Sequence, residues 1–303
     1  MIPSASELAY PKHVSEEVDL LARALGSAGE VFLFVDYGGT LVPDGGDGIA
    51  RRPSRAVRAK LEQLANEAAF SVFVVSRRCV AQLERLVDVP DVGFVGQGGF
   101  EIRGAGGDAF YPVDPAVTGR LVRELEARAA EEMARFQGVR VENLGCTLSV
   151  QLPCEECQVA REATQRFVSL VSEMDERRQL EVLLDRAAVY VRLAGWHKGH
   201  AVRHILAGAD QDAALAIYLG DDVTDEDAFE AVGEWSRPDG PDGPWVVPPM
   251  DEMDESEFDA PPGGLTVLVA ERPRPSAASL FVRNPKEVYE FLSSLAAVAS
   301  SLL

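Results

Sequence analysis

Two apolar runs of this chain end directly in acidic residues, and this pattern limits the fold more than any other feature. Val31–Val35 is followed by Asp36 and a turn with two glycines, and Ala216–Leu219 is followed by Gly220 and a second acidic segment. Short apolar runs bounded by turn residues predict buried strands. In an open α/β sheet, the reactive polar groups gather at the carboxyl ends of the strands. We therefore expect both acidic segments at one edge of a parallel sheet.

Strand and helix patterns alternate through the first third of the chain, which predicts parallel strands joined by right-handed crossovers. After a leading helix near 15–25, we expect strands at 31–35, 70–75 and 92–96, with helices near 53–68 and 80–87 between them. The same alternation returns later, with helices at 198–207, 226–232 and from 285, and strands at 216–219 and 265–269.

The middle third has a different pattern, with helices at 115–136 and 158–174 and paired strands at 139–141, 148–152, 180–184 and 189–193. This order indicates a small α+β layer inserted into the sheet domain. The expected fold class is therefore α/β, with a Rossmann-like core of residues 1–105 and 195–303 and an inserted cap of residues 106–194. Glycines mark the hinges that we expect near 104–107 and 194–195.

Composition excludes several classes of partner. The net charge of −20 argues against nucleic acid, because a phosphate backbone binds surfaces rich in lysine and arginine. Residues 1–14 do not resemble a signal peptide, and the apolar run at 291–303 is shorter than a membrane span.

Four cysteines favour a reducing cytoplasm. The Cys154–Cys157 segment predicts a loop before a helix, with half of a zinc site as the alternative, and the acidic segments 44–48 and 237–264 predict mobile loops.

Asp36 is the first candidate for chemistry. A carboxylate in a tight turn at a strand end can attack phosphorus and form an aspartyl phosphate. This reaction needs a divalent cation to neutralise the phosphoryl oxygens. Asp221 and Asp222 offer the oxygen ligands that Mg²⁺ requires, and the Gly38 carbonyl is a further candidate ligand.

Two polar residues at other element ends complete this set. Lys198, at a predicted helix start, can supply positive charge, and Ser76, after the strand at 70–75, can supply a hydroxyl and a backbone N–H. Each residue is ordinary when taken alone, because serine and aspartate are common helix caps and Asp225 can simply cap the helix that follows it. Their order along the chain makes the set specific.

In this order the residues resemble the motifs of the haloacid dehalogenase (HAD) superfamily, and within it the trehalose-6-phosphate phosphatases. The matches are Asp36 with Thr40, then Ser76, then Lys198, then Asp221 with Asp222. The segment Gly220–Phe229 is typical of the trehalose-phosphatase branch.

The resemblance implies a phosphoric monoester hydrolase that uses Mg²⁺ and an aspartyl phosphate to act on a sugar phosphate. It implies that Asp36, Thr40, Ser76 and Lys198 are catalytic and that Asp36, Gly38, Asp221 and Asp222 hold the metal. It also implies that Arg78, Glu142 and Arg192 contact the substrate.

The sequence departs from the family pattern where substrate and protons would be handled. Gly38 replaces the second aspartate of the first motif, and Gly98 stands where histidine is usual. In the predicted cap, Leu144 replaces a lysine and Tyr190 stands where glutamate is expected, while Arg77 replaces a glycine after the second motif.

Three readings of these departures stay open. The first is a phosphatase that is slow or has an altered substrate, with Glu101, Asp225 or the substrate itself as the acid and base. The second is a catalytically silent relative that binds a sugar phosphate or a partner glycosyltransferase and regulates it. The third is a scaffold whose acidic cleft binds cations. The intact nucleophile and metal positions favour the first.

Overall fold

The computed structural model describes residues 9–43, 51–107, 109–155, 157–185, 187–236 and 263–299. The loops predicted at 44–48 and over most of 237–264 lie outside these ranges.

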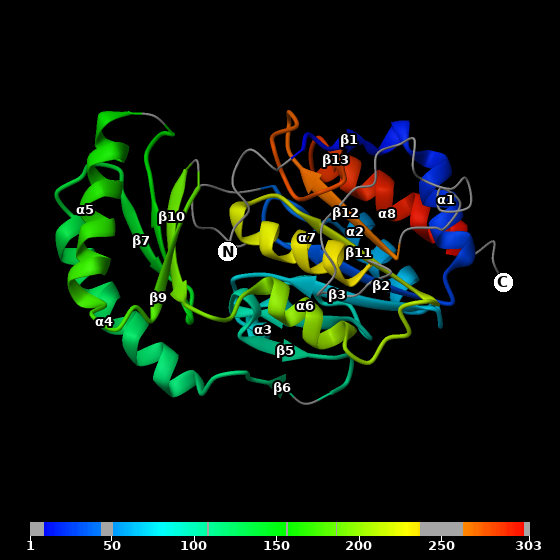
Figure 1. The fold of residues 1–303 in the computed structure, drawn as a ribbon, viewed down its shortest axis with the longest axis horizontal. Coiled ribbons are helices and arrows are strands. Elements are labelled where there is room, and N and C mark those ends of the chain that lie inside the picture. The colour runs from blue at the N-terminus through cyan, green and yellow to red at the C-terminus, as the bar shows by residue number, and fades with distance from the viewer. Residues whose placement is uncertain are drawn as a thin grey trace, which may run out of the picture.

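Among the described residues, a nine-stranded sheet forms the larger lobe, with the strand order β1-β13-β12-β11-β2-β3-β4-β5-β6 (Figure 1). Pairing is parallel from β1 through β4 and antiparallel for β5 and β6. The strands are β1 (Lys12–His13), β2 (Glu30–Asp36), β3 (Phe70–Val75), β4 (Gly93–Gly96), β5 (Glu101–Arg103), β6 (Ala109–Phe110), β11 (Ala214–Gly220), β12 (Gly264–Val269) and β13 (Leu280–Val282). The predicted α/β class with a parallel sheet is confirmed.

Helices cover both faces of this sheet, because successive side chains of a strand point to opposite faces. In β2, Leu33 and Val35 pack into the core under one set of helices, and Phe32 and Phe34 pack into the other. The first set is α1 (Val18–Ser27), α2 (Arg55–Ala65), α3 (Val80–Val87) and α8 (Pro285–Ala299), and the second is α6 (Lys198–Leu206) and α7 (Val223–Trp235).

A separate four-stranded antiparallel sheet forms the smaller lobe, with the order β7-β8-β10-β9, and α4 and α5 pack on its outer face (Figure 1). These elements are β7 (Arg140–Asn143), β8 (Thr147–Gln151), β9 (Leu180–Leu184), β10 (Ala188–Leu193), α4 (Pro115–Met133) and α5 (Gln158–Met174). Apolar side chains from both helices and from β8 and β10 form its own buried core, and partly buried side chains of β7 and β9 pack against it. The inserted α+β layer expected from the sequence is present, although β6 at its predicted start pairs in the larger sheet.

Cys154 and Cys157 form a disulfide just before α5, where the sequence predicts a loop. This pair is therefore oxidised, contrary to the reduced cysteines expected from the sequence, whereas Cys79 and Cys146 are free. No helix within the described ranges combines the length and the apolar character that crossing a bilayer requires.

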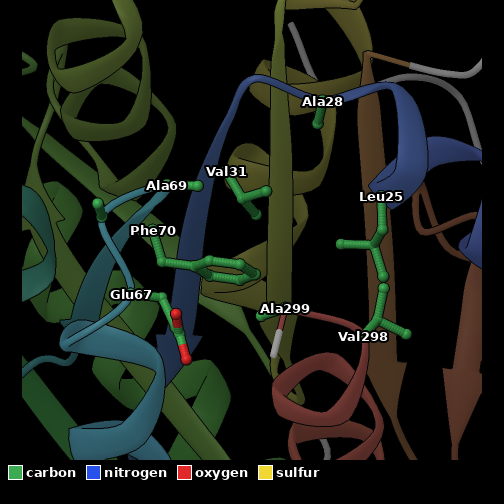
Figure 2. Close-up of a pocket in the computed structure, with 9 residues that line it drawn as sticks. Leu25, Ala28, Val31, Glu67, Ala69, Phe70, Val298 and Ala299 are labelled. Atoms are coloured by element: carbon green, nitrogen blue, oxygen red, sulfur yellow. The ribbon is translucent and has the colours of Figure 1, made fainter. Parts of the chain in front are cut away.

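The structure also contains a largely apolar cavity of about 260 Å³ (Figure 2). Its lining includes Val31 and Phe70, which lie at the starts of β2 and β3, together with residues from the ends of α1 and α8. The predicted site residues follow the other ends of these strands, so this cavity is remote from them.

Candidate active site

The carboxyl ends of β2 and β11 lie side by side, because these strands pair in parallel with Val35 opposite Leu219. Asp36 ends β2, and Asp221 directly follows β11. Between them, Gly39 has a φ of +82°, and a Cβ there would lie 2.0 Å from an Asp221 carboxylate oxygen. The turn after Asp36 therefore requires glycine at this position, both for its backbone conformation and for the close approach of Asp221.

Three carboxylates converge at this edge. Asp36, Asp221 and Asp225 each place an oxygen within 4.8 Å of the others. Burial, and then repulsion from Asp222, Asp36 and Asp225, raises the pKa of Asp221 well above its ordinary value. Of the described residues, Thr40 donates the one side-chain hydrogen bond that the Asp221 carboxylate receives, at 3.3 Å. This carboxylate is therefore short of positive charge.

Lys198 is the cation at the centre of the cluster. Its Nζ lies 2.7 Å from Asp36 Oδ1 and 2.7 Å from Asp225 Oδ1, and the residue is 1% exposed. Burial lowers its pKa, but the attraction of Asp225, Asp36 and Asp222 outweighs burial and raises the pKa above the ordinary lysine value. Burial also raises the pKa of Asp36 to about 8, against the attraction of Lys198.

Asp225 is held on both oxygens. Its Oδ1 accepts from Lys198 and from the Tyr218 hydroxyl, and its Oδ2 accepts from the backbone N–H groups of Asp221 and Asp222. These bonds leave no free carboxylate lone pair directed at a metal. Asp225 therefore fixes Lys198 and the turn after β11.

Asp222 lies elsewhere than the sequence predicts. It caps α7 by accepting from the Thr224 backbone N–H at 2.8 Å, and its other oxygen lies 3.1 Å from Arg77 Nη1. The helix consequently begins at Val223 rather than near 226. Burial raises the pKa of Asp222, but Arg77 and Lys198 outweigh it, so this pKa lies below the ordinary aspartate value. Asp225, not Asp222, joins Asp36 and Asp221 in the acidic group.

The donor set of this cluster fits Mg²⁺. The cation prefers hard oxygen ligands, and the Asp36 and Asp221 carboxylates provide them beside a turn from which glycine excludes a side chain.

Ser76 and Arg78 lie at the neighbouring strand end. Ser76 follows β3 and is buried, its N–H donates to the Val95 carbonyl at 2.8 Å, and its Oγ accepts from the Arg78 N–H at 3.2 Å. The half-buried Arg78 guanidinium makes no hydrogen bond or ion pair with the described residues. Its N–H donors therefore remain available to bind an anion at this edge.

Two departures from the family pattern contact each other. The Arg77 guanidinium lies 4.0 Å from the centroid of the Tyr190 ring, which comes from β10 of the smaller lobe. Arg77 also pairs with Asp222, so it joins the smaller lobe to the cap of α7. The sequence marks both residues as unusual, but nothing in the sequence indicates that residues so far apart meet.

Two residues of the smaller lobe, Arg192 and Glu142, are expected to contact the substrate, and only the first is engaged in side-chain contacts with the described residues. Arg192 donates to Glu181 at 2.8 Å and to Asp227 of α7 at 2.6 Å, and its side chain is 6% exposed. It therefore bridges the lobes, and the expected substrate contact stays a prediction. Glu142 lies half-buried on β7, and its carboxylate makes no hydrogen bond or ion pair with the described part of the chain.

Gly38 leaves an open space beside Asp36. A Cβ built on Gly38 has no atom within 4 Å, and its φ is not in the left-handed region. Glu101, one of the alternative proton carriers, is buried and accepts from the Val80 N–H, the Gln97 amide and the Tyr111 hydroxyl. Gly98, where histidine is usual, lies under the smaller lobe, and a Cβ there would be 3.5 Å from Thr147 Oγ1.

Comparison with known proteins identifies the family that has this arrangement. The Trehalose-phosphatase family model matches residues 34–249, well over half of the chain. The chain belongs to the trehalose-phosphatase family. A trehalose-phosphate phosphatase of Mycobacterium marinum is 28% identical, with the match covering 96% of this chain and 69% of that protein. A probable trehalose-phosphate phosphatase 4 of Oryza sativa subsp. japonica is 25% identical, with the match covering 94% of this chain and 71% of that protein.

Solved structures share the fold of this trehalose-phosphatase family member. The C-terminal domain of the C. albicans trehalose-6-phosphate phosphatase superposes with a TM-score of 0.76 at 21% identity, covering 96% of this chain and 99% of the other. BT1666 from Bacteroides thetaiotaomicron, a HAD-superfamily phosphatase, has a TM-score of 0.52 at 15% identity, covering 90% and 96%. The expected HAD fold and membership of a family of phosphoric monoester hydrolases are both confirmed.

Proposed function

We propose that this chain is a cytoplasmic, Mg²⁺-dependent phosphatase that acts on a sugar phosphate through an aspartyl phosphate on Asp36. The pairing of the buried Asp36 carboxylate with Lys198 Nζ at 2.7 Å, beside the Asp221 carboxylate, carries this proposal. Phosphoryl transfer needs a held nucleophile and concentrated positive charge more than covalent help from the protein. Gly38 and Tyr190 favour slow turnover or a substrate other than trehalose 6-phosphate, such as a related glycosyl or cyclitol phosphate.

The reaction has two steps. An Asp36 carboxylate oxygen attacks phosphorus, the bond to the leaving sugar oxygen breaks, and an aspartyl phosphate forms. Water then attacks the same phosphorus, the bond to Asp36 breaks, and inorganic phosphate leaves. Lys198 orients the Asp36 carboxylate through both steps, because Lys198 Nζ is held in place by Asp225.

The surrounding residues bind the phosphoryl group. The Ser76 hydroxyl and the Arg78 guanidinium donate to its oxygens, and Thr40 orients Asp221 through their 3.3 Å contact. Asp36, Asp221 and the Gly38 carbonyl would hold a magnesium ion, which would supply positive charge that lowers repulsion between nucleophile and phosphate.

The smaller lobe acts as a cap in this proposal, with Glu142 facing the sugar. The moving segment lies within residues 106–194 and begins in practice at α4, since β6 pairs in the larger sheet. The Arg192–Asp227 ion pair and the Arg77–Tyr190 contact hold the closed position.

The second candidate function is a silent relative that binds a sugar phosphate or a partner synthase. The glycine at position 38 is the observation that favours it, because the site lacks the acid that resemblance to the family leads one to expect. The C-terminal domain of the Candida albicans trehalose synthase regulatory protein shares the fold, with a TM-score of 0.60 at 16% identity over 96% of this chain and 99% of that domain.

Phosphate release from a panel of sugar phosphates, with and without Mg²⁺, separates the two functions. We expect release that requires Mg²⁺ in the parent and none in Asp36→Asn, which keeps the shape of the side chain without a nucleophilic carboxylate. Binding of a sugar phosphate without any release, by a folded parent protein, would instead establish the silent relative.

Calorimetry with Mg²⁺ alone tests the metal ligands. We expect Asp221→Asn to weaken binding by about 10-fold or more, since it removes a charged ligand. Asp222→Asn is the matched control, because Asp222 is next to Asp221 in the chain but its carboxylate caps α7. Equal weakening by both variants would restore Asp222 as a ligand, and unchanged affinity in Asp221→Asn would place the cation elsewhere.

A further inference from the structure

Breaking a phosphate ester leaves an electron pair on the departing oxygen. A sugar alcohol is a poor leaving group unless that oxygen receives a proton as the bond breaks, and a positioned acid is typically worth about 10²–10⁴-fold in rate. The question for this site is which group around Asp36 can give that proton.

Three carboxyl groups around the site, those of Asp225, Asp222 and Glu101, are committed to other bonds. Asp225 is held on both oxygens, by Lys198 and Tyr218 on one and by two backbone N–H groups on the other. Asp222 accepts from Thr224 and faces Arg77. Glu101 accepts three hydrogen bonds around η2 (Gln97–Gly99) and β5. All of these contacts are donations to carboxylate oxygens, so the oxygens of these three groups are already occupied.

The remaining polar groups stabilise charge rather than release protons. The Tyr37 hydroxyl, next to Asp36 in the chain, donates to the Arg51 backbone carbonyl. Lys198 Nζ donates to Asp36 and to Asp225. The guanidinium of Arg77 is not deprotonated in proteins, so it cannot serve as the acid. At Gly38 there is no side chain at all, although the space around it is open.

We propose that this site turns over phosphoryl donors whose leaving oxygen is weakly basic, namely acyl phosphates and phosphoanhydrides, in preference to sugar phosphate esters. The inference rests on the proposed aspartyl-phosphate function. Asp36 forms its bond to phosphorus, the bond from phosphorus to the leaving oxygen breaks, and the electron pair stays on a carboxylate or phosphate anion that needs no proton. Arg77 and Lys198 supply positive charge around Asp36 during this step.

The test compares two donors in three proteins. Release of phosphate from acetyl phosphate and from glucose 6-phosphate is measured with Mg²⁺ in the parent, in Gly38→Asp and in Gly38→Asn, and the rate with Asp36→Asn is subtracted. Asp and Asn have nearly the same shape, so the pair isolates the acid. We expect the ratio of kcat/KM for acetyl phosphate over glucose 6-phosphate to be about 10²–10⁴-fold larger in the parent and Gly38→Asn than in Gly38→Asp.

Equal ratios in the parent and Gly38→Asp, with an active parent, would overturn this inference and leave the proposed function standing. No release from acetyl phosphate by a parent that is active on a sugar phosphate would overturn this inference alone, and no release from acetyl phosphate or from any sugar phosphate of the panel would overturn both. Substituted phenyl phosphates give a second measurement that needs only the parent: its rate should fall steeply as the leaving phenol becomes more basic. A flat series would overturn the inference, whatever residue then supplied the proton.

Discussion

The strand-end edge and the face toward the smaller lobe have diverged to different degrees from the family pattern. At the edge, Asp36, Lys198 and Asp221 match the family motifs and are joined by short contacts. Gly38, in the turn after Asp36, and Arg77, which contacts the smaller lobe, both depart from the pattern. Gly38 stands where the family pattern has an aspartate, and Arg77 adds a guanidinium where it has a glycine. The site therefore carries less negative charge than the family pattern would give it.

The departures at Arg77 and Tyr190 form a packed arrangement of their own. Arg77 stacks on Tyr190 and pairs with Asp222, which in turn caps α7. A buried guanidinium without such partners would be costly. We infer that the face toward the smaller lobe has been rebuilt around Arg77, while the strand-end edge has kept the geometry that phosphoryl transfer requires.

The largest expected effect comes from breaking the strand-end edge at Lys198. Lys198→Met keeps the length of the side chain but leaves Asp36 and Asp225 buried without their cation. Removing one partner of a buried ion pair typically costs about 3–5 kcal/mol, and we expect a loss of this size in urea unfolding. Added Mg²⁺ should restore part of it, because a metal at Asp36 and Asp221 replaces some of the lost charge.

Arg203→Met is the control for this experiment, since Arg203 lies on the same helix and pairs with Glu234 near the surface. Such exposed pairs are worth about 0–1 kcal/mol. A loss in Lys198→Met no larger than in this control would mean that the edge does not depend on its central cation.

Much of the strand-end edge could be predicted from the sequence. Strands such as β2 and β11 are long, apolar and bounded by turn residues, so both their place and the convergence of Asp36 and Asp221 follow from general rules for parallel sheets. The short strands β1, β5, β6 and β13 have two or three residues each, too few to give a periodic pattern.

The contacts between the lobes could not be predicted in this way. Arg77 and Tyr190 belong to different lobes, and their contact depends on how the lobes pack rather than on any local pattern. The same holds for Arg192, whose bond to Asp227 joins the two lobes. The partition between Asp222 and Asp225 depends on which carboxylate caps α7, and either residue is a good cap by type.

An intermediate effect is expected from the rebuilt face. Arg77→Met and Tyr190→Leu, alone and together, form a double-mutant cycle for the stacked pair. A cation over an aromatic ring contributes about 0.5–2 kcal/mol, and we expect a coupling energy in this range from urea unfolding. Arg135 and Phe136 form the matched control pair, because they stack at 5.7 Å with Arg135 largely exposed. Coupling no larger than in the control would show that Arg77 and Tyr190 are merely neighbours.

The smallest effect tests whether acidity is tuned away from the strand-end edge as well. Burial, and then repulsion from Asp227 and Glu234, raises the pKa of Glu230 on α7 from 4.5 to about 7. The folded protein therefore binds more protons than the unfolded chain between these two values, so this group makes the parent less stable as pH rises through that window. Glu230→Gln cannot lose a proton and escapes the penalty. Its melting temperature should match the parent's near about pH 4 and exceed it by a few degrees near about pH 8. A difference that is the same at both pH values would show that Glu230 ionises as freely in the folded protein as in the unfolded chain, and would confine the tuned carboxylates to the site.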